Sequence, residues 1–360
     1  MKKHFIILSV YIIIALVMSL PLALNFSSAI PGVEGDAPSY VWALGWAKRA
    51  LELNADLFHT DFIFYPLGGA TQLLWSVALI AFLSLPLQYA FDLIVAHNVM
   101  WLAATVMSGY GMFLLAESVI ANGEIGIAKK QSGVSQLAIR NSQFASFTAG
   151  LVFAFAPLRL GYGLAFLNLF NTQFIPFYLL FLFRAARASK TSLRASESER
   201  SNRRAAITSP LTNNQRRDIF LAGLFLGVNA YIDFQIAAFL GLFSALYAFY
   251  EFIALATLWR ARANGRANYF ALARTLAAIA LTALVIAAPM LGIIASDFAI
   301  EGGDYIRVFK MEYSAARSYD LAMFFIPSAR STLYANVPIK IPGVNAGQTV
   351  DDVGPLSPDR

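Results

Sequence analysis

Residues 5–24 read FIILSVYIIIALVMSLPLAL, an apolar run that directly follows Lys2, Lys3 and His4. A segment of about 20 apolar residues is long enough to cross the hydrocarbon core of a bilayer, which is roughly 30 Å thick. A signal peptide would have a shorter apolar core and a small-residue cleavage site, and the end of this run supplies no such site. The run therefore predicts an uncleaved membrane span at the start of the chain.

The composition of the whole chain indicates the same class of protein. Of its 360 residues, 58% are hydrophobic and only 13% are charged, which is more apolar surface than a soluble domain could bury. The chain has no Cys, so disulfides and thiol chemistry are excluded. Its 27 basic residues exceed its 21 acidic ones, but the excess lies between the apolar runs. We therefore expect no nucleic-acid partner and predict an all-α polytopic membrane protein.

About seven transmembrane helices are predicted. The apolar windows are residues 5–24, 97–116, 144–160, 165–184, 219–232, 236–258 and 270–295. Residues 73–95 are also apolar, but Pro86 interrupts them and Gln88 and Asp92 follow. We predict a juxtamembrane or re-entrant element there, since such backbone is tolerated where protein buries it. A true span at 73–95 is the alternative.

The charges between the windows decide the predicted orientation. Basic residues are concentrated in 117–143, in 184–217 and between Arg260 and Arg274. The positive-inside rule places these segments in the cytoplasm together with the N-terminus. Seven spans satisfy this placement, whereas an eighth span at 73–95 would move 184–217 to the outside.

The orientation defines the expected organisation of the chain. Residues 1–295 form a transmembrane module with a large first extracytoplasmic loop, 25–96, and a basic cytoplasmic loop, 185–217. Residues 296–360 form an extracytoplasmic loop that we expect to be truncated or partly disordered. The protein is predicted to be a multi-pass integral protein of a bacterial inner or plasma membrane.

An acidic pair, Glu34 and Asp36, follows the first window. A carboxylate at the outer mouth of a membrane protein could accept a proton from an attacking hydroxyl or amine, or bind a divalent cation. An ordinary loop acid is the alternative, but the position just outside the first span favours a catalytic role. His59 lacks the clustered ligands of a metal site, so no metal site is predicted.

An aromatic run follows the acidic pair. Tyr40, Trp42 and Trp46 lie about one helical turn apart and precede Lys48 and Arg49, a pattern typical of an amphipathic helix on a membrane surface. The tryptophans could stack on a sugar ring, and the two cations could contact a lipid phosphate. A simple interfacial aromatic belt is the alternative.

Further polar residues interrupt the later apolar windows. Arg159, with Asn168 and Gln173 nearby, lies at the predicted outer end of the third span. A guanidinium group there could bind a phosphate through two hydrogen bonds, or could reach to the lipid headgroups instead. Asp233 lies between two windows and Asp304 lies in the last segment, and both are candidates for substrate binding.

Several short stretches resemble the GT-C-type membrane glycosyltransferases, in particular bacterial protein-mannosyltransferase-like proteins. The stretches are Gly35-Asp36-Ala37 with Trp42 and Trp46, residues 64–68, 153–160, 171–176 and 318–327. The resemblance implies a module of seven spans, a catalytic acid early in the first outer loop and a polyprenyl-phosphate sugar as donor. Asp36 occupies the place of that acid. The chain departs from the family between Gly161 and Asn168, where related sequences often carry histidines.

These observations predict a glycosyltransferase that moves a sugar from a polyprenyl-phosphate donor to an acceptor on the extracytoplasmic face. Asp36 would act as general base, with Glu34 in support. The expected partners are the lipid-linked donor and membrane lipid, and the acceptor is left open. No organic cofactor is expected, and a divalent cation is left open. The alternatives are a transporter or flippase of lipid-linked sugars, although no internal repeat supports it, and a non-catalytic membrane subunit.

Overall fold

The computed structural model describes residues 2–32, 36–63, 65–66, 68–70, 72–121, 136–195, 211–259 and 265–300. These ranges are almost entirely helical, which confirms the all-α prediction. The exception is a two-residue antiparallel pair, β1 (His59–Thr60) and β2 (Gly69–Ala70). The chain divides into a compact unit, Met1–Asp297, and a second unit, Phe298–Arg360. The predicted loop 296–360 lies almost wholly outside the described residues.

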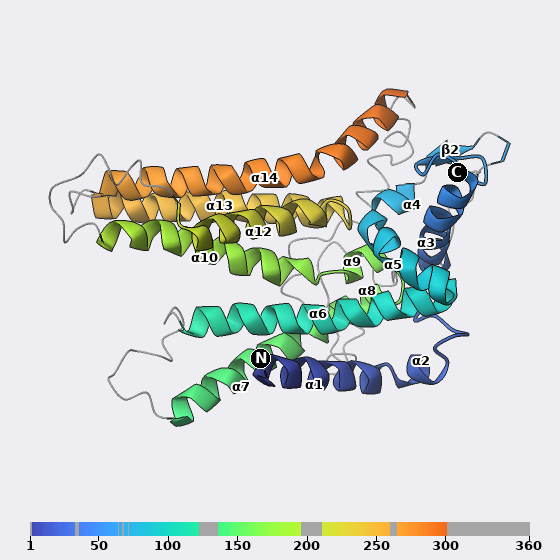
Figure 1. Ribbon diagram of the computed structural model, residues 1–360, viewed down its shortest axis with the longest axis horizontal. Helices are drawn as coiled ribbons and strands as arrows, with labels where there is room; N and C mark the ends of the chain where they lie inside the picture. The colour runs from blue at the N-terminus through green and yellow to red at the C-terminus, as the bar shows by residue number, and fades with distance from the viewer. Residues whose placement is uncertain are drawn as a thin grey trace, which may run out of the picture. The chain divides into compact units, whose positions relative to one another are not determined.

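The first unit is built around long helices that run side by side (Figure 1). They are α1 (Lys2–Met18), α6 (Leu93–Ala121), α7 (Gln136–Ala154), α10 (Phe174–Ala195), α12 (Asn213–Asn229), α13 (Phe234–Trp259) and α14 (Gly265–Ile300). Helix α6 contacts α1, α7 and α10, and α10 in turn contacts α12. Each predicted window overlaps one of these helices.

Glycines allow the closest helix contacts of this bundle. A Cβ on Gly150 of α7 would lie 1.9 Å from the Tyr11 hydroxyl of α1 and 2.5 Å from the Gly109 carbonyl of α6. The Tyr11 hydroxyl donates a hydrogen bond to the Phe147 carbonyl at 3.0 Å. A side chain at Gly150 would therefore separate three helices that now meet at one point.

Among the described residues, three helices are long and apolar enough to cross a membrane: residues 93–121, 234–255 and 269–296. Residues 141–154 and 157–163 form a fourth candidate if the pair, bent by 41°, counts as one span. Ala156 is extended, with φ −55° and ψ 131°, because the following Pro157 disfavours a helical conformation in the residue before it. The membrane class is thus supported by these helices, and the count of seven spans stays a prediction.

The window 165–184 differs from its prediction in a similar way. It is divided between a short helix, α9 (Leu167–Phe170), and α10, which begins at Phe174. Asn171 to Gln173 form the break, and the Asn171 side chain donates to the Leu167 carbonyl, ending α9. Amide side chains that bond to nearby backbone compete with helix continuation.

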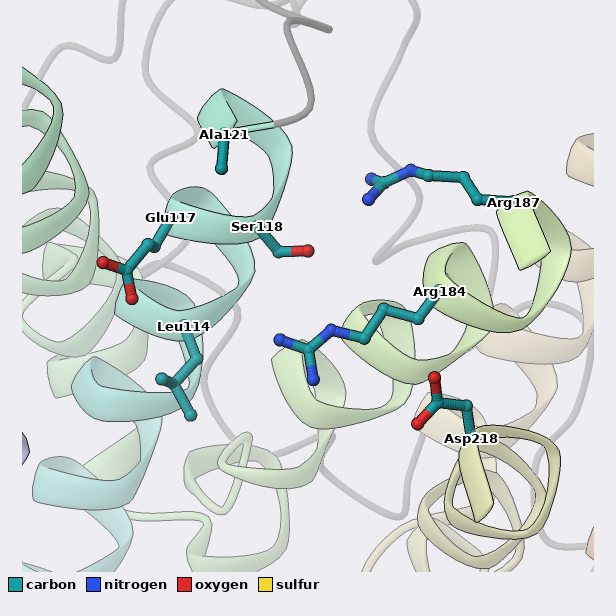
Figure 2. A pocket seen from close by; sticks show the side chains of 7 residues that line it. All are labelled: Leu114, Glu117, Ser118, Ala121, Arg184, Arg187 and Asp218. Carbon is teal, nitrogen blue, oxygen red and sulfur yellow. The ribbon is translucent and has the colours of Figure 1, made fainter. Parts of the chain in front are cut away.

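The described helix ends that flank the predicted basic segments lie at one end of the bundle (Figure 1). Lys3 at the start of α1 forms an ion pair with Glu117 near the end of α6. Figure 2 shows the same end of α6 facing Arg184 and Arg187 of α10. Ala186, also of α10, packs with Leu255 and Leu272, which flank the predicted connection between α13 and α14. We call this the basic end.

The opposite end carries shorter helices, of which α3 (Asp36–Leu53), α4 (Gln72–Trp75) and α5 (Ala78–Ala90) belong to the predicted first outer loop. Helix α2 (Leu20–Leu24) is the end of the predicted first window, 5–24, which is broken at Ser19. Helix α5 has 13 residues, so at 1.5 Å per residue it extends about 20 Å and is too short to cross the hydrocarbon core alone. It packs against α3 and α6 instead. This placement fits the predicted juxtamembrane element at 73–95.

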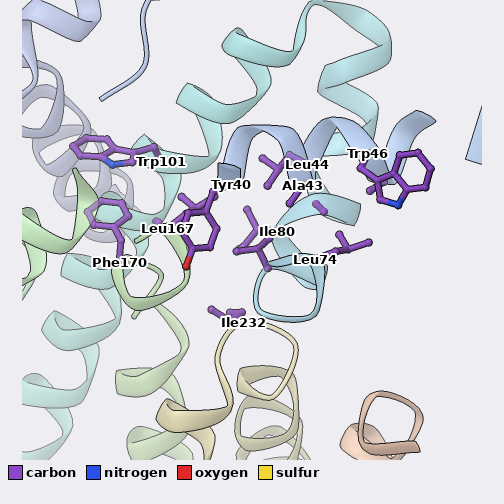
Figure 3. Close-up of a cluster of buried hydrophobic side chains, with 14 of the residues drawn as sticks. Tyr40, Ala43, Leu44, Trp46, Leu74, Ile80, Trp101, Leu167, Phe170 and Ile232 are labelled. Carbon is purple, nitrogen blue, oxygen red and sulfur yellow. The ribbon is translucent and has the colours of Figure 1, made fainter. Parts of the chain in front are cut away.

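A hydrophobic cluster fixes α3 at this end (Figure 3). Apolar residues recur along α3 at a spacing of three and four, which places them on one helical face. That face, Tyr40, Ala43, Leu44 and Ala47, packs against buried residues of α4 and α5, with Trp101, Leu167, Phe170 and Ile232 from later helices and turns. The cluster joins the predicted outer loop to the bundle, and the polar candidates lie around it.

Candidate functional site

Asp36 is the first residue of α3, and its side chain is exposed. The first turn of a helix presents unsatisfied N–H groups and the positive end of the helix dipole, which favours a carboxylate at this position. The carboxylate is therefore held where the backbone stabilises it while it stays open to solvent. Glu34 lies outside the described residues.

A buried polar relay begins one helical turn after Asp36. The Tyr40 hydroxyl donates to the Asn168 side-chain oxygen at 2.7 Å, and the Asn168 amide donates to Asp233 at 2.6 Å. The three side chains, which we call the Tyr40–Asn168–Asp233 relay, are all at least nine-tenths buried. They connect α3, α9 and the turn between α12 and α13.

Burial, with the negative charges of Asp36 and Asp233, raises the pKa of Tyr40 to about 12, against a lowering contribution from Ser76. Tyr40 is therefore a neutral donor to Asn168, which in turn donates to Asp233. The sequence predicted Tyr40 only as part of an aromatic run. The spacing of four residues between Asp36 and Tyr40 was the available signal, because it places both on one face of a helix.

Asp233 is held firmly at both carboxylate oxygens. One oxygen accepts from Asn168, and the other accepts from the backbone N–H of Ile236 at 2.9 Å. The second contact caps the start of α13, a common role for Asp at this position. Asp233 thus fixes the relay and the helix, while Asp36 is the open carboxylate of the pair.

Arg159 lies on α8 (Pro157–Gly163) and is directed into the protein, with only 5% of its surface exposed. Its guanidinium donates to Thr172 at 2.9 Å, to the Ala154 carbonyl at 2.8 Å and to Thr105 at 3.4 Å. It also stacks on the Phe170 ring, 3.9 Å from the ring centroid. In this conformation the Arg159 side chain does not reach outward to lipid headgroups, so that alternative was wrong.

The charge of Arg159 is not balanced by a neighbouring acid. Within the described ranges, its hydrogen bonds go to hydroxyls and a carbonyl rather than to a carboxylate, and its Nη2 has no partner. A buried cation without an opposite charge costs several kcal/mol. An anion that reached Nη2 would remove much of this cost.

Helix α9 links Arg159 to the relay. Asn168 on this helix belongs to the relay, and Phe170, two residues later, supports the Arg159 guanidinium and stacks on Trp101 with centroids 4.7 Å apart. Arg159 and Asp233 thus each contact a residue of this short helix, and Asp36 lies one helical turn before Tyr40 of the relay.

The cations of α3 have partners within the protein. Lys48 donates to the Gln88 carbonyl at 3.0 Å and lies 4.6 Å from the Tyr89 ring centroid. Arg49 lies 3.6 Å from Glu52 on the same helix. The Lys48 contacts attach α3 to the end of α5, whereas the Arg49 contact stays within α3.

The predicted stacking residues differ in exposure. Trp42 and Trp46 are stacked, with centroids 5.9 Å apart and ring planes 3° apart. Trp46 is buried and donates to the Leu57 carbonyl, so it packs α3 against the following loop. Trp42 is half-buried and is the tryptophan that a ligand reaches more easily.

The remaining candidates for substrate binding are Gln173 and Asp304. Gln173 is buried and donates to the Asn171 side chain at 3.2 Å, close to Thr172 and hence to Arg159. Asp304 lies outside the described residues. In the described part of the chain, no group of three or more His, Asp or Glu side chains is arranged to hold a metal ion.

No protein-family model, no curated protein and no solved structure matches this chain. The resemblance to GT-C glycosyltransferases is therefore carried by the short stretches of the sequence alone, and functional arguments start from the geometry described above.

Proposed function

We propose that this protein is a GT-C-type membrane glycosyltransferase in which Asp36 is the general base. The observation that carries the proposal is the position of Asp36: an exposed carboxylate at a helix start, one turn from the buried Tyr40–Asn168–Asp233 relay, at the end of an apolar bundle. A lipid-linked donor and a water-soluble acceptor can meet only at such an end.

The proposed reaction is an inverting transfer from a polyprenyl-phosphate sugar. Asp36 accepts the proton of the acceptor hydroxyl or amine, and the acceptor atom forms a bond to the anomeric carbon. The bond between that carbon and the phosphate oxygen breaks, and its electron pair leaves with the lipid phosphate. Charge develops on the phosphate, so a cation fixed beforehand at that position lowers the barrier.

Arg159 is the cation best suited to the lipid phosphate. Its Nη2 has no partner in the described ranges, and its other nitrogens are held by Thr105, Thr172 and Ala154. A guanidinium fixed in this way can donate to a phosphate oxygen without losing further rotational freedom. In the proposed mechanism the relay is a positioning element that orients α3, and therefore Asp36.

We further propose that α1, α6, α7 with α8, α10, α12, α13 and α14 are the seven spans, with the basic end in the cytoplasm. The proposal is supported by the ion pair of Lys3 with Glu117 and by the packing of Ala186 with Leu255 and Leu272, since these contacts gather every predicted cytoplasmic segment at one end. The positive-inside rule assigns the basic end to the cytoplasmic side of the membrane.

The topology can be tested with single cysteines, because the native chain has none. We expect Ser28→Cys, between α2 and α3, to react with a membrane-impermeant maleimide in intact cells. Ser196→Cys, in the basic loop, should react only after the membrane is permeabilised. Labelling of Ser196→Cys in intact cells would overturn the proposed orientation.

The activity can be tested with the full chain in proteoliposomes. We expect it to release polyprenyl phosphate from a polyprenyl-phosphate hexose when a hydroxylated acceptor is supplied in the outer buffer. A flippase would instead move the intact donor between leaflets without releasing the sugar. Donor movement without cleavage would favour the transporter alternative. If the donor is neither cleaved nor moved, the result would favour a non-catalytic subunit.

A further inference from the structure

A cavity of about 460 Å³ lies between α6, α10 and α12 at the basic end, away from the candidate site. It is lined by Leu114, Glu117, Ser118 and Ala121 of α6, Arg184 and Arg187 of α10, and Asp218 of α12. In Figure 2 both guanidinium groups and the Ser118 hydroxyl point into the gap between α6 and α10, whereas Glu117 points away from it.

The charge around this cavity is positive. Glu117 is engaged by Lys3, and Asp218 accepts from Arg217 at 2.9 Å. With Arg184 and Arg187, four cations therefore surround two carboxylates. The arginines lie three residues apart on α10, so they share a helical face and can address the same ligand.

The depth of the cavity matches that of lipid headgroups. Helix α6 has 29 residues, which at 1.5 Å per residue is about 43 Å, close to the thickness of a bilayer including its headgroups. The lining residues of α6 occupy its last two turns. Leu114, the lining residue farthest from the helix end, gives the cavity an apolar wall, and the charged and hydroxyl groups lie nearer the end.

We propose that this cavity binds the phosphate of an anionic glycerophospholipid of the cytoplasmic leaflet. Arg184 and Arg187 donate to the phosphate oxygens, Ser118 donates a further hydrogen bond, and the acyl chains leave along Leu114 toward the bilayer. Basic pockets between spans on the cytoplasmic side are suited to anionic headgroups. The inference rests on the proposed membrane placement and is independent of sugar transfer.

The experiment uses the purified full chain in detergent, with phosphatidylglycerol or phosphatidylcholine added and bound lipid counted by native mass spectrometry. We expect the wild-type chain to retain phosphatidylglycerol preferentially. The double variant Arg184→Ala/Arg187→Ala should bind it about 30-fold more weakly, the change that corresponds to about 1 kcal/mol for each arginine near an anionic lipid.

A matched control removes the same charge elsewhere. Arg216→Ala/Arg274→Ala changes two exposed arginines of α12 and α14 and should leave lipid binding unchanged. If the alanine pair in the cavity fails to fold, as judged by circular dichroism, the milder Arg184→Gln variant should still show roughly a fivefold loss.

The proposal would be overturned by equal retention of the two lipids by the wild-type chain, by an equal loss of phosphatidylglycerol in the control pair, or by unchanged binding by Arg184→Gln. Displacement of the lipid by equimolar inorganic phosphate would also reject it, because the cavity would then recognise phosphate without its lipid. None of these measurements depends on sugar transfer. The lipid-binding proposal can therefore be rejected while the proposed activity stands, and the reverse is also possible.

Discussion

Replacing Asp36 with Asn is expected to lower sugar transfer by roughly 10²–10⁴, the usual contribution of a general base. Asn keeps the size of the side chain, and the lost charge–dipole interaction is only about 0.3–1 kcal/mol, so α3 should form as before. It has no oxygen basic enough to accept the proton of the acceptor. The measurement is the release of polyprenyl phosphate in proteoliposomes, with donor binding followed in parallel.

The matched control is Asp61→Asn. Asp61 is another exposed acid of the predicted first outer loop and should tolerate the change without loss of transfer. Donor binding should be similar in both variants, because Asp36 is proposed to act on the acceptor. Full activity of Asp36→Asn would remove the proposed mechanism and would favour the transporter or the non-catalytic subunit.

Replacing Arg159 with Met is expected to separate donor binding from stability. Binding of the polyprenyl-phosphate donor should weaken by about 10- to 100-fold, since a hydrogen bond to a charged group contributes about 1.5–3 kcal/mol. The free energy of unfolding in detergent should change by less than about 2 kcal/mol. The variant loses hydrogen bonds to Thr172 and Ala154, but it also ends the burial of an unbalanced charge.

Arg216→Met provides the control for this test. Arg216 is exposed near the start of α12, in the predicted basic cytoplasmic loop and outside the candidate site. We expect neither donor binding nor stability to change. A purely structural role for Arg159 would produce the opposite pattern, with a large loss of stability and unchanged donor affinity in the molecules that remain folded.

Local sequence patterns predicted the elements but not their breaks. The apolar windows predicted where the long helices lie. Helix α5 is short, but it continues through Pro86 and Gln88 to Ala90, so the prediction that Pro86 interrupts 73–95 was wrong. The break at Asn171 to Gln173 and the bend before Pro157 were missed, because a hydropathy window averages over a few polar residues or a single proline.

The relay could not be predicted from any local pattern. Tyr40 lies 128 residues from Asn168, and Asn168 lies 65 residues from Asp233. Periodicity reports which residues share a face of one helix, but not which distant turn packs against that face. Asp233 was therefore considered a candidate on its own, without the partners that hold it.

The sequence by itself determined the membrane class and the position of Asp36 just after the first apolar window, and it predicted that the basic segments lie opposite an acidic outer loop. These properties depend on composition and order along the chain, since apolar length and loop charge act locally on insertion into a bilayer. Only the tertiary structure decided that Arg159 points inward, that Tyr40 is linked through Asn168 to Asp233, and that Arg184 and Arg187 face a cavity. Such contacts depend on how helices distant in sequence pack together, and this packing fixes the direction of each side chain.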